Sequence, residues 1–199
     1  RRAQHHNEDS GSDEEDDVFE LEELHLTENP AAPKIERKPV DETADKLDSL
    51  MELVVAYLSR REAGGELPQV FDTLLRAFET SLLHAYRSKF TQFLLFWACA
   101  RDSSHRNSAA FCDSLMRCIH DGTQPPNTRL AAVAYLASFL SRANYLPPDS
   151  VTHYVVQLGS QCLRMLEDAS RPQKVGGSGH GDICCSLCQA LLYVLCYRL

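Results

Sequence analysis

Residues 128–148, with the sequence TRLAAVAYLASFLSRANYLPP, constrain the fold most because they describe one helix together with its two ends. Alanine and leucine fill the interior of this segment, and both favour the helical backbone. Asn127 or Thr128 can cap the start through a side-chain oxygen, whereas Pro147 and Pro148 prevent the helix from continuing. The segment therefore predicts a helix that is followed directly by a turn.

Six further helices are predicted by apolar residues at helical spacing between turn signals. Gly64 and Gly65 end the first of these helices, and Pro68 suits the first turn of the second. No segment alternates as a surface strand would, so we expect an all-α fold. The six helices cover residues of about 42–62, 68–84, 88–100, 108–120, 149–166 and 182–199.

Short connections make antiparallel helix hairpins the natural unit of this chain. Such hairpins would begin near residues 43, 88, 127 and 182, at intervals that scatter about the roughly 40 to 47 residues of a HEAT or armadillo repeat. We therefore predict an irregular HEAT/armadillo-like α-solenoid over residues 43–199, with an ordinary helix bundle as the alternative. The apolar run ALLYVLCYR reaches Leu199, so we expect the array to be truncated at its C-terminal end.

The acidic charge is confined to one end of the sequence. Residues 1–45 carry 15 acidic and 5 basic residues, whereas the rest of the chain is almost neutral within the overall net charge of -8. A block of like charge with few apolar residues cannot bury enough surface to fold, so residues 1–42 are predicted to be a disordered acidic segment. The near-neutral remainder argues against a dedicated nucleic-acid binder and leaves direct DNA contact open.

The apolar segments of the chain indicate neither a membrane span nor a disulfide framework. The longest nearly apolar run, residues 183–197, is too short to cross a bilayer, so we expect no membrane partner. Most of the eight cysteines lie inside apolar segments that are predicted to be helical, which favours reduced, buried thiols in the nucleus or cytosol. These are Cys99, Cys112, Cys118, Cys162, Cys184, Cys188 and Cys196.

No motif points firmly to a metal, a cofactor or catalysis. His180, Cys184, Cys185 and Cys188 could suggest zinc, but Cys184 and Cys188 share a helix face with Leu191, Leu192 and Leu195, and we interpret them as core. The run GGSGHGD lacks a preceding strand and the lysine of a nucleotide-binding loop, so it is interpreted as a connector. We expect no catalytic residue, cofactor or metal, and rank a metal or thiol enzyme last.

One helix offers a candidate protein-binding stripe. Tyr135, Phe139 and Arg142 follow one another at spacings of four and three residues, opposite the stripe that contains Val133 and Leu136. Two apolar faces indicate a helix between two neighbours, and this interpretation is favoured. The alternative is that Tyr135, Phe139 and Arg142 bind a partner protein.

The acidic segment holds two candidate phosphorylation sites. Ser10 and Ser12 lie in EDSGSDEEDD, with acidic residues two to five positions downstream, and this context suits acid-directed kinases. Each phosphate would add about -1.5 to -2 charges to an already anionic segment and would extend it further. An unmodified solvated segment is the alternative.

Several blocks of the sequence resemble the family of RNA polymerase I-specific transcription initiation factors. They are ADKLDSLMELVVAYL, TQFLLFWACA, DSLMRCIHDGTQPPNTRLAA, LASFLSRANYLP and CSLCQALLYVLCYR, and they occur in the same order as in the family. The resemblance implies a HEAT-repeat protein without catalytic activity. It also implies that the acidic segment is an internal loop of a longer protein.

The same resemblance implies a function and a location. The family binds RNA polymerase I and bridges it to the promoter-bound core factor for ribosomal RNA synthesis, which places it in the nucleus and nucleolus. The loops GGELP and ARDSSHRNS and the glycine-rich segment depart from the family pattern, so no partner contact is carried over there. The resemblance also implies that the family's polymerase-facing surface lies in repeats outside this sequence, so no polymerase-contact residue is assigned. A homodimer is a further possible assembly. A generic HEAT or armadillo adaptor, used in transport or in organising a complex, is the alternative function.

Overall fold

A computed structural model describes residues 42–85, 90–169 and 180–198. The described residues form helices without any strand, which confirms the predicted all-α class. Of the predicted acidic segment, only its last residue, Glu42, lies within the described residues. The elements are α1 (Glu42–Ala63), α2 (Leu67–Thr80), the 3-10 turn η1 (Leu82–His84), α3 (Gln92–Ala100), α4 (Arg106–His120), α5 (Pro126–Arg142), α6 (Pro148–Ala169) and α7 (His180–Arg198).

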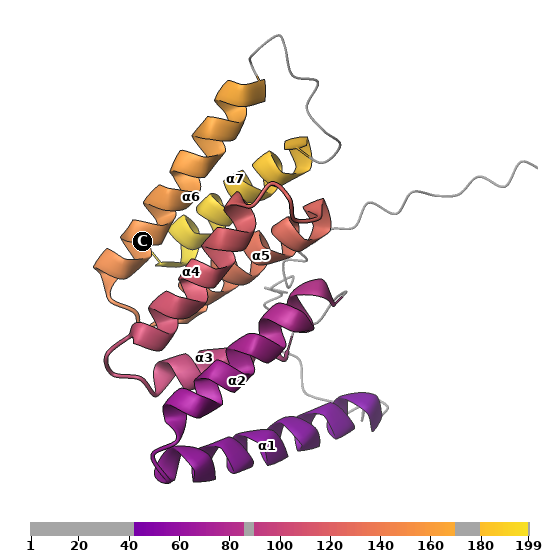
Figure 1. Cartoon of the computed structure of the whole chain (residues 1–199), viewed down its shortest axis with the longest axis vertical. Coiled ribbons are helices and arrows are strands. Elements are labelled where there is room, and N and C mark those ends of the chain that lie inside the picture. Colours follow the sequence, from indigo (N-terminus) through magenta and orange to yellow (C-terminus); the bar gives the residue numbers. More distant parts are fainter. Residues whose placement is uncertain (1–41, 86–89, 170–179, 199) are drawn as a thin grey trace, which may run out of the picture.

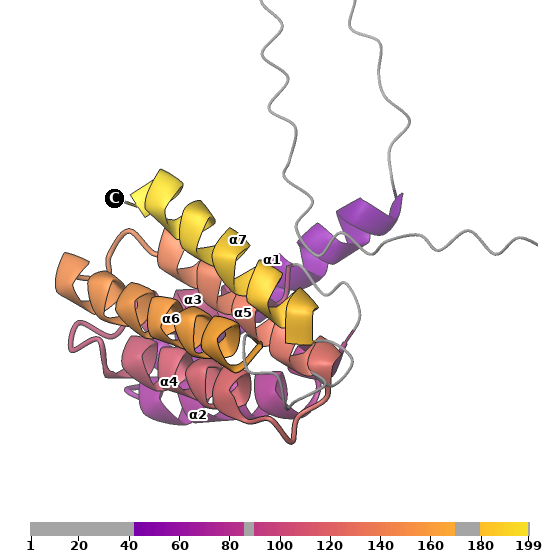
Figure 2. The same cartoon turned by 90° about the horizontal axis from the view of Figure 1, so that it is seen from above.

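The helices from α2 onward stack in two layers. Helices α2, α4 and α6 lie along one side of the stack, and α3, α5 and α7 lie along the other (Figures 1 and 2). Successive helices pair as α2 with α3, α4 with α5 and α6 with α7, while α3–α4 and α5–α7 contacts join one pair to the next. This arrangement is the predicted irregular α-solenoid of helix hairpins.

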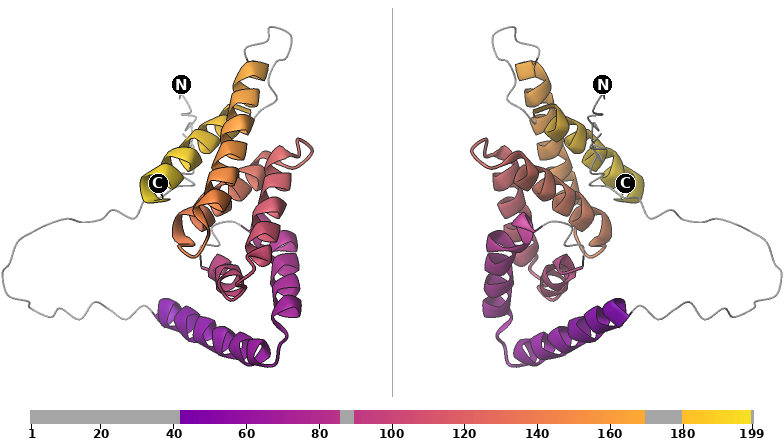
Figure 3. Two further views of the ribbon diagram at one scale, coloured as in Figure 1. Left: turned by 90° about the vertical axis from the view of Figure 1, so that its left-hand side faces the viewer. Right: turned by 90° about the vertical axis from the view of Figure 1, so that its right-hand side faces the viewer.

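A glycine turn separates α1 from the rest of the stack. Gly65 has φ +79°, a left-handed conformation that glycine adopts without steric cost. The Glu66 N–H donates to the Arg61 carbonyl at 3.1 Å and the Gly65 N–H to the Glu62 carbonyl at 2.8 Å, which closes the last turn of α1. Helix α1, which precedes this turn, crosses the end of the stack and packs on α2 (Figure 3). Among its described side chains, Leu58 alone is buried.

Several predicted helix boundaries are wrong, among them the start of the helix expected over residues 88–100, which begins at Gln92. The second helix was expected to reach His84, but the α-helix ends at Thr80 because Ser81 leaves the helical backbone, with φ -129° and ψ -55°. Residues Leu82–His84 continue as a 3-10 turn. The helix expected to start at Asn127 or Thr128 begins at Pro126 instead, and the Thr128 hydroxyl lies 3.3 Å from Nδ1 of His84. Thr128 thus joins α5 to the 3-10 turn.

Helix α5 is the centre of the fold. It contacts α4, α7 and the 3-10 turn, and it is buried on more than one side. Its predicted apolar stripe is fully buried, as the sequence indicated: Val133, Leu136, Ala137 and Leu140. The alanines of α5 let neighbouring helices approach closely, because a methyl group keeps the distance between helix axes short.

An aromatic cluster fills the space between α5 and the helices that precede it. The Phe139 ring lies 4.8 Å from the Phe96 ring and 5.1 Å from the Phe111 ring, both in edge-to-face geometry. The Phe78 ring lies 5.2 Å from Phe111 and 4.9 Å from Tyr135. Edge-to-face pairs of this kind add about 0.5 to 1.5 kcal/mol each beyond area burial. The cluster therefore holds α2, α3, α4 and α5 together.

We expect Phe139→Ala to lower the free energy of unfolding by about 3 to 5 kcal/mol, because it leaves a cavity among three aromatic rings. Arg142→Ala, three residues further along α5 at an exposed position, should change it by about 0.5 kcal/mol or less. Urea unfolding followed by circular dichroism measures both values. Equal effects of the two substitutions would contradict the central position of Phe139.

The loop before α4 is organised by one carboxylate. Asp102 accepts hydrogen bonds from the Ser104 N–H at 2.9 Å and from the Asn107 N–H, in the first turn of α4, at 2.8 Å. Burial acts to raise the pKa of Asp102, but the hydrogen bonds donated by Ser104 and Asn107 outweigh it and hold the pKa below its usual value. The loop also contains His105 at φ 56°, a left-handed residue just before the helix. Asp102 satisfies backbone donors that the helix itself leaves unpaired.

Asp102→Ala should lower the free energy of unfolding at neutral pH by about 1 kcal/mol, the usual effect of losing a capping side chain. Because the folded-state pKa is depressed, the stabilisation is present above the ordinary carboxyl pKa of about 3.9 and is lost as the pH falls through the folded-state value. The difference from the unmodified chain should therefore shrink from about pH 5 to about pH 3.

Urea unfolding across this pH range measures the difference, with the exposed Asp72→Ala on α2 as the control. A pH-independent difference for Asp102→Ala would show that its charge plays no part in stability.

Candidate interaction surfaces

The three residues of the predicted binding stripe lie in different environments. Phe139 is fully buried in the aromatic cluster, and Tyr135 is half-buried against Phe78. Phe139 therefore offers no exposed surface to a partner in this structure, whereas Tyr135 keeps part of its side chain exposed and stays a candidate contact. Arg142 is exposed and donates from Nη1 to the Ser138 hydroxyl at 2.7 Å. Arg142 is the member of the stripe whose side chain is exposed.

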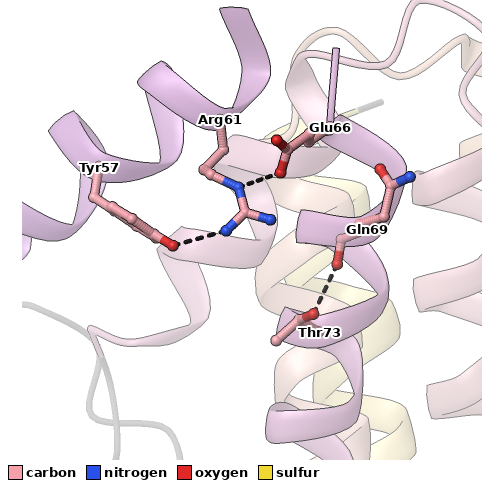
Figure 4. A network of polar contacts seen from close by, with 5 residues as sticks. All are labelled: Tyr57, Arg61, Glu66, Gln69 and Thr73. Atoms are coloured by element: carbon pink, nitrogen blue, oxygen red, sulfur yellow. Dashed lines mark hydrogen bonds and ion pairs between the residues drawn. The ribbon is translucent and has the colours of Figure 1, made fainter. Parts of the chain in front are cut away.

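Helix α1 presents an exposed apolar face. Leu50, Leu53 and Tyr57 are 59%, 64% and 51% exposed, at spacings of three and four residues that place them on one side of the helix. The Arg61 guanidinium donates to the Tyr57 hydroxyl at 2.8 Å and forms an ion pair with Glu66 after the turn (Figure 4). Tyr57 is thus fixed in position although it is exposed.

The start of α2 completes the polar network at this junction. In the same view the Thr73 hydroxyl donates to the Gln69 carbonyl at 2.7 Å, within α2 (Figure 4). On the other side of the junction, Arg101 lies 3.3 Å from the Glu62 carboxylate and stacks over the Trp97 ring at 5.0 Å. These polar contacts, together with the packing of Leu58, set the angle between α1 and the stack.

A second set of exposed apolar side chains lies on the last helix pair. Helix α6 exposes Val156, Leu163 and Leu166 at 60%, 62% and 48%. Helix α7 exposes Leu192 and Leu195 at 63% and 43%. Leu163 and Leu166 are three residues apart and lie on one side of α6, and a contiguous apolar patch is typical of surfaces that contact other protein.

The predicted inward face of α7 is wrong. Cys188, Leu192 and Leu195 were expected in the core, but all three are exposed, and Leu191 is half-buried. The buried side of the helix instead carries Ile183, Leu187, Ala190 and Val194. Helix α7 is apolar almost all round, so its sequence pattern does not distinguish its inner from its outer side. Cys196, also expected to be buried, is exposed, whereas Cys99, Cys112 and Cys162 are buried as predicted.

Three thiols meet between α6 and α7. The Cys162 sulfur lies 3.4 Å from the Cys188 sulfur and 3.9 Å from the Cys184 sulfur. Burial, followed by the contacts with Cys188 and Cys184, raises the pKa of the Cys162 thiol to about 12. Of the zinc candidates in the sequence, Cys184 and Cys188 belong to this cluster, whereas Cys185 is exposed outside it. The side chain of His180 lies outside the described residues.

Sequence reasoning missed Cys162 as a member of the cluster. It lies on another helix, 22 residues before Cys184, and no short motif connects them. The one available signal was that Cys162 falls on the same side of its predicted helix as Leu158 and Val155, next to the chain's last hairpin. That signal places the residue at an interface without naming its neighbours.

A polar groove of about 430 Å³ lies between the end of α4 and the end of α6. Arg129 donates to the Ile119 carbonyl from Nε at 3.0 Å and from Nη2 at 2.8 Å, so its charge satisfies the end of α4. Burial, reinforced by Arg164 and Arg129, lowers the pKa of His120. The groove is therefore lined by polar groups that already have partners and by the His120 imidazole, which is neutral at neutral pH. Its lining is completed by Gly122, Gln161, Met165 and Asp168.

A cavity of about 270 Å³, smaller than the polar groove, lies between α4 and α6. The Tyr154 hydroxyl, from α6, donates to the Asp113 carboxylate at 3.0 Å, and its oxygen also lies 3.3 Å from the Ala109 carbonyl oxygen, the alternative acceptor. Burial raises the pKa of Tyr154, so this hydroxyl stays protonated and joins the two helices. The cavity is lined further by His105, Ser108, Cys112, Leu146, Asp149, Ser150 and His153.

Some sequence predictions fall on residues that the structure does not describe. Ser10 and Ser12 lie outside the described residues, as does most of the glycine-rich run before α7. Within the described ranges, none of the helices combines the length and the hydropathy that crossing a membrane requires.

Comparison with known proteins gives one consistent family. The family model for the RNA polymerase I specific transcription initiation factor RRN3 matches residues 1–199. Similar relatives include the RNA polymerase I-specific transcription initiation factor rrn3 of Schizosaccharomyces pombe, which is 26% identical over 77% of this chain and 26% of its own length. The corresponding factor of Mus musculus is 25% identical over 94% of the chain and 30% of its own length. That of Saccharomyces cerevisiae is 24% identical over 80% and 26%.

The fold agrees with the same family. The crystal structure of RNA polymerase I transcription initiation factor Rrn3 superposes with a TM-score of 0.66, at 24% sequence identity, over 77% of this chain and 33% of that one. The chain spans between 26% and 30% of the lengths of the curated relatives above. Because the family model matches all 199 residues, the chain belongs to the family of RNA polymerase I-specific transcription initiation factors RRN3.

Proposed function

We propose that the protein carrying this chain acts with RNA polymerase I in the initiation of ribosomal RNA synthesis. In this role it binds the polymerase and bridges it to the promoter-bound core factor. The family match along the whole chain carries the proposal. The relatives named for this polymerase support it, because their similarity covers 77% and 94% of this chain. Such a role would take place in the nucleus, and within it in the nucleolus.

The architecture supports a non-catalytic scaffold. A stack of helix pairs offers a long surface, and two large partners can bind such a surface at the same time. Helix α1 and the α6–α7 pair lie at opposite ends of the described stack (Figure 1), and each carries exposed apolar side chains. Separate surfaces of this kind suit a protein that brings two assemblies together. Self-association into a homodimer and direct contact with promoter DNA are further outcomes for the experiment to decide.

Arg142 is the residue of the predicted stripe that we propose as a partner contact. It is exposed at the last turn of α5, and its guanidinium makes one hydrogen bond within its own helix. An arginine in this position presents further donors to a partner, and arginine is enriched at protein interfaces.

Affinity purification of the tagged full-length protein from its own nuclei, followed by mass spectrometry at moderate salt, should enrich RNA polymerase I subunits and core-factor subunits. In the same experiment, Arg142→Glu should reduce recovery of one of these assemblies about tenfold, which corresponds to about 1.4 kcal/mol of binding free energy. The mutation reverses one exposed charge and leaves the buried cluster intact.

Arg76→Glu is the matched control, because it reverses the charge of an exposed arginine on α2. If Arg142→Glu and Arg76→Glu behave alike, Arg142 is no contact although the polymerase proposal stands. Recovery of transport complexes or other assemblies without polymerase would instead identify a generic helical-repeat adaptor. A second, differently tagged copy in the eluate would reveal a homodimer, and nuclease treatment would reveal partners held through DNA.

We further propose that Ser10 and Ser12 are phosphorylated by an acid-directed kinase. The proposal rests on the downstream acidic residues, which such kinases recognise, and on the added negative charge that would weaken contact with acidic partners. Intact-mass and peptide analysis of the protein from growing and resting cells should detect one or two phosphates on residues 8–17. Unmodified serines in every growth state would contradict the proposal, and Ser103 and Ser104 in the described loop serve as internal reference serines.

A further inference from the structure

We propose that Cys162, Cys184 and Cys188 bind one thiophilic metal ion of the Zn²⁺ or Cu⁺ class. Their three sulfur atoms come from two different helices and lie within 4.8 Å of one another. The inference is independent of the proposed role in transcription. It replaces the expectation that these cysteines are only core residues.

The distances between the sulfur atoms suit a shared ion. Zinc binds thiolate sulfur at about 2.3 Å, which separates two ligands by about 3.8 Å in a tetrahedral site and by about 4.0 Å in a trigonal one. The Cys162–Cys184 and Cys162–Cys188 separations are 3.9 Å and 3.4 Å. Small rotations about the side-chain bonds of Cys188 would therefore place all three sulfur atoms at bonding distance from one centre.

The positions of the three residues on their helices keep the sulfur atoms together. Cys184 and Cys188 are one turn apart on α7, so their side chains project from the same side of that helix. Cys162 faces them from α6, and α6 packs against α7 along the pair. Leu158 and Leu187, fully buried on the same two helices, fix this packing. The site is thus preorganised by the core and not by a flexible loop.

Burial differs among the three thiols in a way that suits metal binding. Cys162 is buried, Cys184 is half-buried and Cys188 is exposed. The exposed side gives an ion a route from solvent and leaves a coordination position that water can occupy. Thiolates prefer soft ions, so the donor set selects Zn²⁺ or Cu⁺ over Mg²⁺ or Ca²⁺. Binding would release the thiol protons as the ion takes their place.

A disulfide is the competing use of the same atoms. Joining the Cys162 and Cys188 sulfur atoms would remove two protons and two electrons, which requires an external oxidant such as a disulfide or a peroxide. The third thiol would then have no role. A metal ion engages all three thiols without any redox change, which is why the arrangement favours metal.

The test uses the purified 199-residue chain, reduced and freed of metal, and titrated separately with Zn²⁺ and with Cu⁺ against a chelator of known affinity. Co²⁺ serves as a spectroscopic probe because thiolate-to-cobalt charge-transfer bands report sulfur coordination. We expect one ion per chain, a cobalt–thiolate band, and a higher unfolding temperature with the ion bound, because the folded arrangement of the three thiols binds the ion more tightly than the unfolded chain does. The two titrations give the affinity of the site for each ion.

Cys184→Ser/Cys188→Ser should weaken binding by more than about 100-fold and abolish the cobalt band, since changes to outer-shell groups alone cost about 10- to 100-fold. Cys185→Ser/Cys196→Ser is the matched control, because it removes two exposed cysteines of α7 outside the cluster. Cys162→Ala gives a second variant on the other helix, and circular dichroism checks the helix content of each.

Loss of binding in the cluster variants with retention in the control supports the site. Equal binding by the two double variants would overturn it, as would the absence of any one-to-one complex in the unmodified chain. A Cys162–Cys188 disulfide in protein isolated from its own cells under thiol-blocking conditions would also overturn it, because those thiols would then be unavailable for metal.

Discussion

The structure depends on the burial of α5 on more than one side. A surface helix needs one apolar stripe, but α5 contacts α4, α7 and the 3-10 turn, and its aromatic side reaches α2 and α3 as well. Phe139 is the residue through which these contacts combine, because its ring touches Phe96 and Phe111 on two other helices. Each neighbour fixes α5 and is fixed by it. The two layers of the stack follow from this shared helix.

Much of the fold could be predicted from the sequence because local chemistry determines where helices begin and end. Gly65 and Pro68 set the boundary between α1 and α2, and Pro147 and Pro148 separate α5 from α6, as their backbone preferences require. The rotation of α7 about its axis could not be predicted. Leu192 and Leu195 are as apolar as Leu187 and Val194, so only the neighbouring helices decide which pair is buried. The thiol cluster escaped prediction for the same reason, since Cys162 meets Cys188 through tertiary packing.

The candidate sites also differ in whether the sequence or only the structure could identify them. The family was recognisable from blocks of sequence, and it led to the proposed partners, whereas the surfaces that would meet those partners required the structure. A scaffold binds through side chains that are exposed by the fold, and no short motif marks them. Leu50 and Leu53 on α1 and Leu163 on α6 belong to helices whose periodicity alone would equally suit a buried position. Conversely, the spacing of Phe139 made it a candidate for binding a partner, but its side chain is buried in the core.

The attachment of α1 has a consequence for how the molecule opens. Among its described side chains only Leu58 is buried, so little apolar surface is exposed when α1 detaches, whereas the helices around α5 can separate only by breaking the shared core. Helix α1 is thus a separate cooperative unit with a small opening free energy. Its amide protons will exchange with solvent far sooner than those of α5. The ion pairs of Arg61 with Glu66 and of Arg101 with Glu62 then hold α1 at its angle to the stack, so breaking them should release α1 while the body of the protein stays folded.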